Sequence, residues 1–402
     1  MRKWSLAIVA AGLALAPAPA LAFQPAPAQP GPQPAPAAAS PAATAPSTPT
    51  PAAVVPVIGP PPPGTYVIDA IDVGTGLSIL VEGNDFTLLY DAGSNDDGAR
   101  GADDRVLAYL RAVRPDLKVI DQLFLSHPHE DHDAMIDDVL ATYEVRNVWN
   151  SGSLNNTCAY HAFLDAVAAE PGVAYHDALA SGGTHDASFT PSKSKCHGAV
   201  RTATVHVPRA GQIAIGTAIP LGAGARMTIL HADGHASGKH FNDASLVTRL
   251  DLGTRHVLLM GDAGGENEVR HPPSTPARPD SVEGGLLANF PALLPADVLI
   301  VGHHGSMTSS RVNFLNAVNA HDFVISVGPK LYSGTQLPDP PVVTELTRRG
   351  SVWRTDRNDS ACPTNPRKIG NDNDGKPGGC DNVQIVIDVN GAITAGYSPL
   401  TD

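Results

Sequence analysis

Basic residues are scarce in this sequence. Its 402 residues include 27 Lys and Arg against 40 Asp and Glu, which gives a formal net charge of −13. Proteins that bind nucleic acid non-specifically usually present a basic surface, and proteins that dock on anionic membranes use clusters of Lys and Arg. The charge balance disfavours both classes for the chain as a whole, although it leaves room for a local basic groove.

Long apolar runs are also lacking. Basic residues at positions 2 and 3 precede the apolar run Leu6–Leu15, and an A-x-A site follows at residues 20–22. A membrane-spanning helix needs about 20 apolar residues, so this run is too short for an anchor, which is the alternative interpretation. The pattern predicts a secretory signal peptide over residues 1–22. We therefore expect a secreted or periplasmic protein with no transmembrane segment after signal cleavage.

Cysteines are few, at Cys158, Cys196, Cys362 and Cys380. Four cysteines allow three pairings, and an oxidising compartment favours disulfides. We expect the pairs nearest in sequence, Cys158–Cys196 and Cys362–Cys380. A cysteine metal site is the alternative, but the C-x-x-C spacing typical of such sites is missing.

Composition divides the chain into three parts. Residues 23–63 are almost entirely Pro, Ala, Gln, Ser and Thr, which cannot bury a core, so they predict an extended linker. Residues 64–402 suit one large domain. Residues 150–225 are rich in Gly, Ser, Thr and Ala, and we expect them to form an insertion or long loops. Elsewhere in the domain, apolar strands outnumber helices but alternate with them, which predicts two sheets in a sandwich with helices outside.

The strongest chemical signal is Ser126-His127-Pro128-His129-Glu130-Asp131-His132. Three imidazoles and a carboxylate follow directly after an apolar strand expected over Val119–Leu125. These are ligands that suit Zn²⁺, Mn²⁺ or Fe. Because this clustering at a strand end is rare in a merely solvated loop, the pattern predicts a metal site.

Two further strands end in similar residue types. The apolar run His256–Met260 leads through a glycine to Asp262, and Val298–Val301 leads to His303 and His304. Each of these endings alone would be unremarkable. Together with the first, they predict one site at one edge of the sheets.

The order of these motifs resembles the metallo-beta-lactamase superfamily, and within it the soluble domain of the competence protein ComEC and its stand-alone relatives. The resemblance rests on D-V-G-x-G, L-x-D-A-G, S-H-P-H-x-D-H, N-D-x-S-L, G-D-A and G-H-H-G-S, which span most of residues 65–330. It implies an α+β fold, an αββα four-layer sandwich, and a hydrolytic site with one or two metal ions, Zn²⁺ first, with Mn²⁺ or Fe as alternatives.

The resemblance also implies roles for individual residues. One metal would be held by His127 and His129, and the second by Asp131, His132 and His303. Asp262 would bridge the two ions. Asp131 could in addition orient the nucleophile, and His304 would act on the substrate or orient another group by a hydrogen bond.

This sequence departs from the superfamily pattern at several positions. The usual third histidine of the first metal has no match, and Asn242 and Ser245 agree with the ComEC-like version at that position. The motif G-x-G-D ends here in Leu77. The late G-H-P is absent, and the segment that begins at Tyr332 stands roughly in its place.

These observations favour a metal-dependent hydrolase that attacks a phosphodiester or another small molecule with an activated water. A nucleic-acid substrate fits the ComEC-like motifs but gains no support from the net charge. The alternatives are a carboxyl-type hydrolase acting on a lactam, lactone or ester, and a non-catalytic metal-binding module. The sequence contains no G-x-S-x-G nucleophile motif.

Overall fold

The computed structural model describes residues 57–179, 183–189, 203–266, 268–332, 334–364 and 379–397. Contacts divide the chain into two units, Met1–Pro49 and Thr50–Asp402, and all described helices and strands belong to the second. The expected signal peptide and most of the expected linker lie outside the described residues. Within the described part, none of the helices combines the length and the apolar character that crossing a membrane requires.

The first sheet has ten strands in the order β17-β16-β1-β2-β3-β4-β5-β6-β8-β7. Strands β3 to β6 pair in parallel, whereas β1, β2, β16 and β17 pair antiparallel. The bounds of its strands are β1 Tyr66–Ala70, β2 Ile79–Gly83, β3 Phe86–Tyr90, β4 Val119–Leu125, β5 Glu144–Asn150, β6 Ala174–Asp177, β7 Thr184–Phe189, β8 Ala203–Gln212, β16 Val383–Ile387 and β17 Ile393–Tyr397.

The second sheet has seven strands in the order β15-β14-β13-β12-β11-β10-β9. Its strands β12 to β15 pair in parallel and the others antiparallel. The bounds are β9 Ala218–Gly222, β10 Ala225–His231, β11 Val247–Leu252, β12 Arg255–Leu259, β13 Val298–Ile300, β14 Asp322–Ile325 and β15 Ser351–Arg354.

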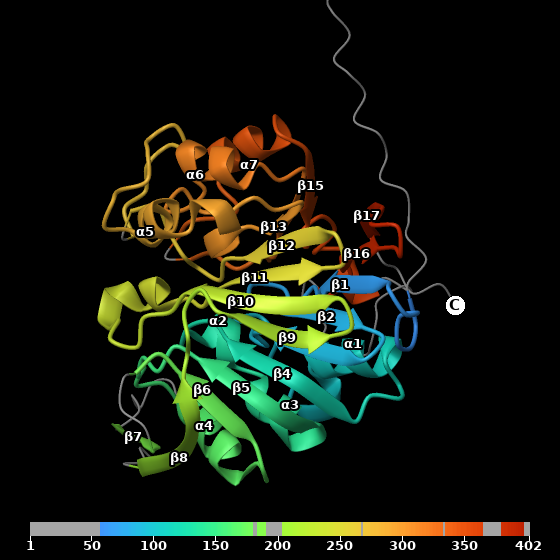
Figure 1. The fold of residues 1–402 in the computed structure, drawn as a ribbon, viewed down its shortest axis with the longest axis vertical. Helices are drawn as coiled ribbons and strands as arrows, with labels where there is room; N and C mark the ends of the chain where they lie inside the picture. The colour runs from blue at the N-terminus through green and yellow to red at the C-terminus, as the bar shows by residue number, and fades with distance from the viewer. Residues whose placement is uncertain are drawn as a thin grey trace, which may run out of the picture. The chain divides into compact units, whose positions relative to one another are not determined.

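Helices cover the outer face of each sheet, so the domain has four layers (Figure 1). Helices α1, α3 and α4 pack on the first sheet, and α5, α6 and α7 pack on the second. The bounds are α1 Arg105–Val113, α2 Glu130–Asp133, α3 Ile136–Thr142, α4 Cys158–Ala169, α5 Val282–Asn289, α6 Val312–Val318 and α7 Pro340–Thr347. The predicted αββα sandwich is confirmed.

Central strands are apolar on both faces because each contributes to two cores. In β4, Phe124 lies in the core between the sheets, while its neighbours Leu123 and Leu125 lie in the core under α1, α3 and α4. In β13, Val298 and Ile300 face the first sheet and the intervening residue faces the opposite helices. Successive side chains of a strand point to opposite faces, so a buried strand reads as a continuous apolar run. The position of each strand end is thereby fixed from both sides.

Residues 150–225, expected as an insertion or long loops, carry more regular structure than the sequence indicated. They contain α4 and the strands β6 to β9, which widen both sheets. These strands contain few large apolar residues, and the buried positions of β7 are His185 and Ala187. The edge position of β7 and β9 in their sheets explains this, because an edge strand buries less of its surface than a central one.

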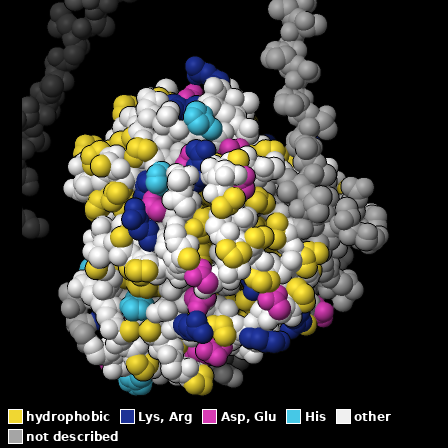
Figure 2. All heavy atoms as spheres, turned by 45° about the vertical axis from the view of Figure 1, so that its right-hand side comes forward, with side chains coloured by type: hydrophobic (Ala, Val, Ile, Leu, Met, Phe, Trp, Pro, Cys, Tyr) yellow, Lys and Arg dark blue, Asp and Glu magenta, His cyan; other side chains and the backbone are white. Residues whose placement is uncertain are grey.

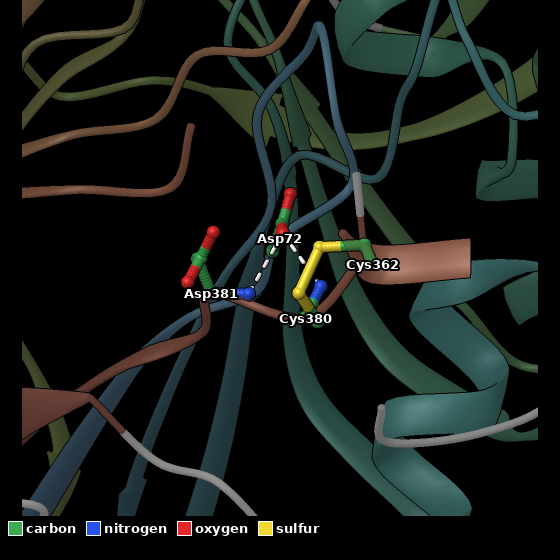
Figure 3. A group of neighbouring side chains, drawn as sticks. All are labelled: Asp72, Cys362, Cys380 and Asp381. Carbon is green, nitrogen blue, oxygen red and sulfur yellow. Dashed lines mark hydrogen bonds between the residues drawn. A yellow bond between two sulfur atoms is a disulfide. The ribbon is translucent and has the colours of Figure 1, made fainter. Parts of the chain in front are cut away.

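One expected disulfide is confirmed, between Cys362 and Cys380 (Figure 3). The other expected pair includes Cys196, which lies outside the described residues. Beside the disulfide, the buried Asp72 carboxylate accepts hydrogen bonds from the backbone N–H groups of Cys380 and Asp381, at 2.7 and 2.8 Å. Although this cluster has metal-ligand residue types, its sulfurs are bonded to each other and one Asp72 oxygen is already occupied. It ties β16 to the end of β1.

Candidate metal centre

The predicted site residues meet where strands of both sheets end. The loop Ser126–His132 follows β4, Asp262 follows β12, and His303 and His304 follow β13. β4 pairs in parallel with its neighbour β3, and β12 with its neighbour β13, so their carboxyl ends lie at a common edge of each sheet. Ligand sites commonly form at such edges. The structure thus brings together the three strand endings that the sequence singled out.

Backbone strain is concentrated around the site. Within the described part of the chain, six residues other than glycine have positive φ, and four of them lie at the site: Asp91, Glu268, His303 and His304. A left-handed conformation is unfavourable for residues with a Cβ, and such residues persist where the surrounding structure enforces them. The strain supports a functional role for this edge.

Two glycines let the metal loop approach the first sheet closely. A Cβ added to Gly93 would lie 2.3 Å from the backbone nitrogen of His132, and one added to Gly76 would lie 2.7 Å from the carbonyl oxygen of Asp131. Leu77 N–H also donates to this carbonyl at 3.0 Å. Only glycine fits such close backbone approaches. These two residues therefore fix where Asp131 and His132 sit.

The first donor group consists of Asp131, His132 and His304, all buried, together with one oxygen of Asp262. Asp262 Oδ1 lies 3.3 Å from His132 Nε2 and 3.6 Å from His304 Nε2, and His304 Nε2 lies 3.6 Å from Asp131 Oδ2. Ligand bonds of about 2.0–2.1 Å in a tetrahedral arrangement separate the donor atoms by roughly 3.4 Å. The spacing fits a single ion among these atoms.

The second donor group consists of His127, His129 and the other oxygen of Asp262. His127 Nε2 lies 3.0 Å from His129 Nδ1 and 3.6 Å from Asp262 Oδ2. His127 is buried, whereas His129 is half-buried. Asp262 thus contributes one oxygen to each group, which is the arrangement expected of a bridging carboxylate.

Outer hydrogen bonds orient the imidazoles of the first group. His132 Nδ1 donates to Asp91 Oδ2 at 2.7 Å, and His304 Nδ1 donates to the carbonyl oxygen of Ser326 at 2.8 Å. Asp91 in turn accepts hydrogen bonds from the backbone and the hydroxyl of Ser126. Such partners fix the ring and leave the second nitrogen for a metal. Nε2 is therefore the atom through which each of these two histidines would bind a metal.

Three of the inward-facing donor atoms are buried without a hydrogen-bond partner: His132 Nε2, His304 Nε2 and Asp262 Oδ1. Leaving buried polar atoms unpaired costs free energy, so such atoms are uncommon in folded proteins. Here they converge on one point, and their nitrogen and oxygen chemistry suits Zn²⁺, Mn²⁺ or Fe. The residues present therefore fit a metal ion.

Mutual attraction between imidazoles and carboxylates dominates the electrostatics of the site. Burial raises the pKa of Asp262, but the surrounding histidines outweigh it and bring the pKa well below its ordinary value. Burial lowers the pKa values of His132 and His304, but Asp262 and the other nearby carboxylates outweigh it and raise both. Burial also lowers the pKa values of His127 and His303, and there it prevails. Perturbed groups gathered in one cleft are typical of functional sites.

His303 and His304 differ from their expected positions. The expectation placed His303 with Asp131 and His132, but the structure places His304 there. His303 Nδ1 lies 2.5 Å from Thr308 Oγ1, and its Nε2 lies 3.2 Å from Asn242 Nδ2 and 3.7 Å from Asp262 Oδ2. Both residues have φ near +50°, so the chain turns between them and sends the second ring toward Asp131.

The donor groups open into a cavity of about 570 Å³. Sequence reasoning did not assign a role to several of its lining residues, which are Asn242, Glu268, Arg270, Thr308 and Tyr332. Glu268 is notable because burial and the charge of Asp262 raise its pKa to about 7. The sequence gives no sign of the positive φ of Glu268. This residue also lies outside the three strand endings that carry the motifs, so no sequence pattern marked it as a site residue.

Comparison with known proteins identifies a family for this chain. The sequence model of the metallo-beta-lactamase superfamily matches residues 71–328 of the chain. Recombination protein 2 of Haemophilus influenzae is 27% identical over 264 residues, which are 66% of this chain and 24% of that protein. The chain therefore spans about a quarter of the length of this curated relative.

Solved structures with a similar fold are more distant. The metallo-beta-lactamase fold protein YhfI of Bacillus subtilis is 14% identical, with a TM-score of 0.38, over 73% of this chain and 97% of that one. Zn²⁺-bound PqqB of Methylobacterium extorquens is 11% identical, with a TM-score of 0.37, over 72% and 97%. The superfamily match covers more than half of the chain and includes the three strand endings, after β4, β12 and β13, that form the site. The chain belongs to the metallo-beta-lactamase superfamily, whose members are metal-dependent hydrolases.

Proposed function

We propose that the protein is an exported phosphodiesterase that uses a metal-activated water. The observation that carries this proposal is the sharing of Asp262, whose two oxygens belong to two separate donor groups. Paired ions a few ångströms apart are typical of enzymes that cleave phosphate esters, because they hold both the attacking and the leaving oxygen. The name of the relative, Recombination protein 2, also points toward nucleic acid or its fragments.

In this proposal, each residue of the site has a role. Asp131, His132, His304 and Asp262 would hold one ion, and His127, His129 and Asp262 the other. When bound, such ions lower the pKa of a water toward neutrality and stabilise charge on phosphoryl oxygens. Asp131 would also orient the nucleophile. Attack on phosphorus forms one P–O bond and breaks the bond to the leaving alcohol, which departs with the electron pair and takes a proton from solvent.

The charges around the cavity support a small diester over a long polyanion. Four carboxylates line the cavity, from Glu130, Asp131, Asp262 and Glu268. Among the described residues that line the cavity, Arg270 alone has a permanent positive charge, and it forms an ion pair with Asp339. On the face shown in Figure 2, Lys and Arg side chains are dispersed among acidic ones. Long nucleic acids bind through many Lys and Arg contacts with phosphates, which this lining does not offer.

The test compares three substrates with one preparation. Metal content is measured, and then turnover of bis-p-nitrophenyl phosphate, p-nitrophenyl acetate and a chromogenic cephalosporin is followed before chelation, after chelation and after addition of Zn²⁺ or Mn²⁺. We expect bound metal and a chelator-sensitive turnover of the diester that the added metal restores. Turnover of the ester or the lactam without the diester would overturn the phosphodiesterase proposal in favour of a carboxyl-type hydrolase.

A further inference from the structure

Tyr332 is a cavity-lining residue to which neither the donor groups nor the fold assigns a role. Its ring stacks on His304, with the ring centroids 5.3 Å apart and the planes at 18°. Two backbone hydrogen bonds of 2.8 and 2.9 Å with Thr335 close the short turn that begins at Tyr332. The side chain is thus held against a proposed metal ligand rather than left free at the surface.

The hydroxyl of Tyr332 is the unusual part of this side chain. Its oxygen is buried and has no hydrogen-bond partner. It lies close enough to the Asp131 carboxylate for that charge to act on it. A phenol has a pKa of about 10, so the hydroxyl keeps its proton at neutral pH. The site therefore contains a fixed, uncharged hydroxyl that no hydrogen bond within the described residues satisfies.

Packing alone does not account for the hydroxyl. The ring of Tyr332 packs against the core between the second sheet and its helices. Phenylalanine would fill the same space and stack on His304 in the same way, without burying an unpaired polar atom, which is unfavourable. What tyrosine adds to phenylalanine is one hydrogen-bond donor inside the cavity.

We propose that the hydroxyl of Tyr332 donates a hydrogen bond to the substrate oxygen that gains negative charge during hydrolysis. A preorganised donor that meets a developing charge stabilises the transition state more than the bound substrate. Tyr332 keeps its proton throughout, so the step adds no proton transfer to the hydrolysis described above. This inference rests on the proposed function and adds one catalytic residue to it.

The test is Tyr332→Phe, measured with bis-p-nitrophenyl phosphate. Removal of one such donor lowers kcat by about 100- to 1000-fold in comparable sites, and we expect KM to change by less than about threefold. Metal content should stay at the wild-type level, and the midpoint of thermal unfolding should stay the same or rise, because the variant buries no unpaired hydroxyl. If the hydroxyl instead served to stabilise the fold, the midpoint of thermal unfolding of the variant would fall.

Tyr175→Phe is the matched control. Tyr175 lies in β6, in the core beneath α1, α3 and α4, and its buried hydroxyl likewise lacks a hydrogen-bond partner. Its removal should leave kcat unchanged. An unchanged kcat in Tyr332→Phe, or a loss of metal in step with activity, would overturn the inference. If the wild-type protein cleaves an ester and no diester, the proposed function fails, and the same kcat ratio on that ester still decides the role of Tyr332.

Discussion

The two donor groups of the metal centre share Asp262 but differ in how firmly their imidazoles are held. In the first group, His132 and His304 are buried, and each has a hydrogen bond of 2.7 or 2.8 Å to a fixed acceptor on its outer side. In the second group, His127 has a longer contact of 3.0 Å with Ser126, and His129 is half-buried. The first group is the more rigid of the two.

This difference bears on metal affinity. Donors that are already oriented lose little freedom when an ion binds, so a rigid group binds an ion more tightly than an adaptable one with the same ligands. The second group also lacks the usual third imidazole, because Asn242 and Ser245 stand in the motif that would supply it. The nearby His303 does not replace it, since Thr308 and Asn242 engage its ring. We therefore expect one tightly held ion at Asp131, His132 and His304, and a weaker one at His127 and His129.

The largest effect is expected from Asp262→Ala, which removes the ligand that both groups share. Metal content should fall for both ions and diester turnover should drop by about 100-fold or more, because activation of water depends on the bound metal. Asp280→Ala is the control. Asp280 is exposed, and its ion pair is with Arg278, which does not line the cavity. Turnover at the wild-type level in the Asp262 variant would refute the shared-ligand assignment. Circular dichroism checks that the fold is retained.

The two neighbouring histidines offer a sharper comparison. His304→Gln should remove the tight ion, with a loss of metal affinity larger than the 10- to 100-fold that is typical when an outer partner is lost. His303→Gln should leave the tight ion in place and affect only the weaker one. Titration of each apoprotein with Zn²⁺ in the presence of a competing chelator measures both. If the His303 variant loses the tight ion and the His304 variant keeps it, the original expectation for His303 is restored.

The smallest of these effects is expected from Asp91→Asn. The asparagine preserves the shape of the side chain but weakens its hold on His132 Nδ1, because a charged acceptor is replaced by a neutral one. We expect the affinity of the tight ion to fall by about 10- to 100-fold, with little change at the weaker one. The same competition titration measures both. Equal losses at the two ions would show that the groups do not differ in the way described above.

Much of the fold could be predicted from the sequence, because it depends on local patterns. Central strands such as β4 and β13 are short apolar runs, and their ends carry the motifs. The strand-rich pattern with intervening helices was enough for the four layers, and the Cys362–Cys380 pair followed from proximity in sequence. Strands β6 to β9 were missed because they contain few large apolar residues, and because β7 and β9 lie at sheet edges, where a strand buries less of its surface.

The sequence was enough to predict which strand endings form the site, but not which individual side chains point into it. His303 and His304 are adjacent and chemically identical, and only their left-handed backbone decides which ring faces Asp131. Glu268 and Tyr332 line the cavity from irregular segments that are distant in sequence from the metal loop Ser126–His132. No local sequence pattern marks such residues. Asn242 stood in a recognised motif, but its contact with His303 spans 61 residues of sequence.

The close approach at Gly76 and Gly93 has a consequence for attempts to evolve this enzyme in the laboratory. At these positions any side chain would collide with the backbone of Asp131 or His132 rather than with a neighbour that can move aside. A library that randomises them would consist mostly of inactive clones, whereas the cavity wall at Asn242, Glu268 and Arg270 can vary without touching that backbone. New substrate preferences are therefore to be sought in the wall, with the two glycines held constant.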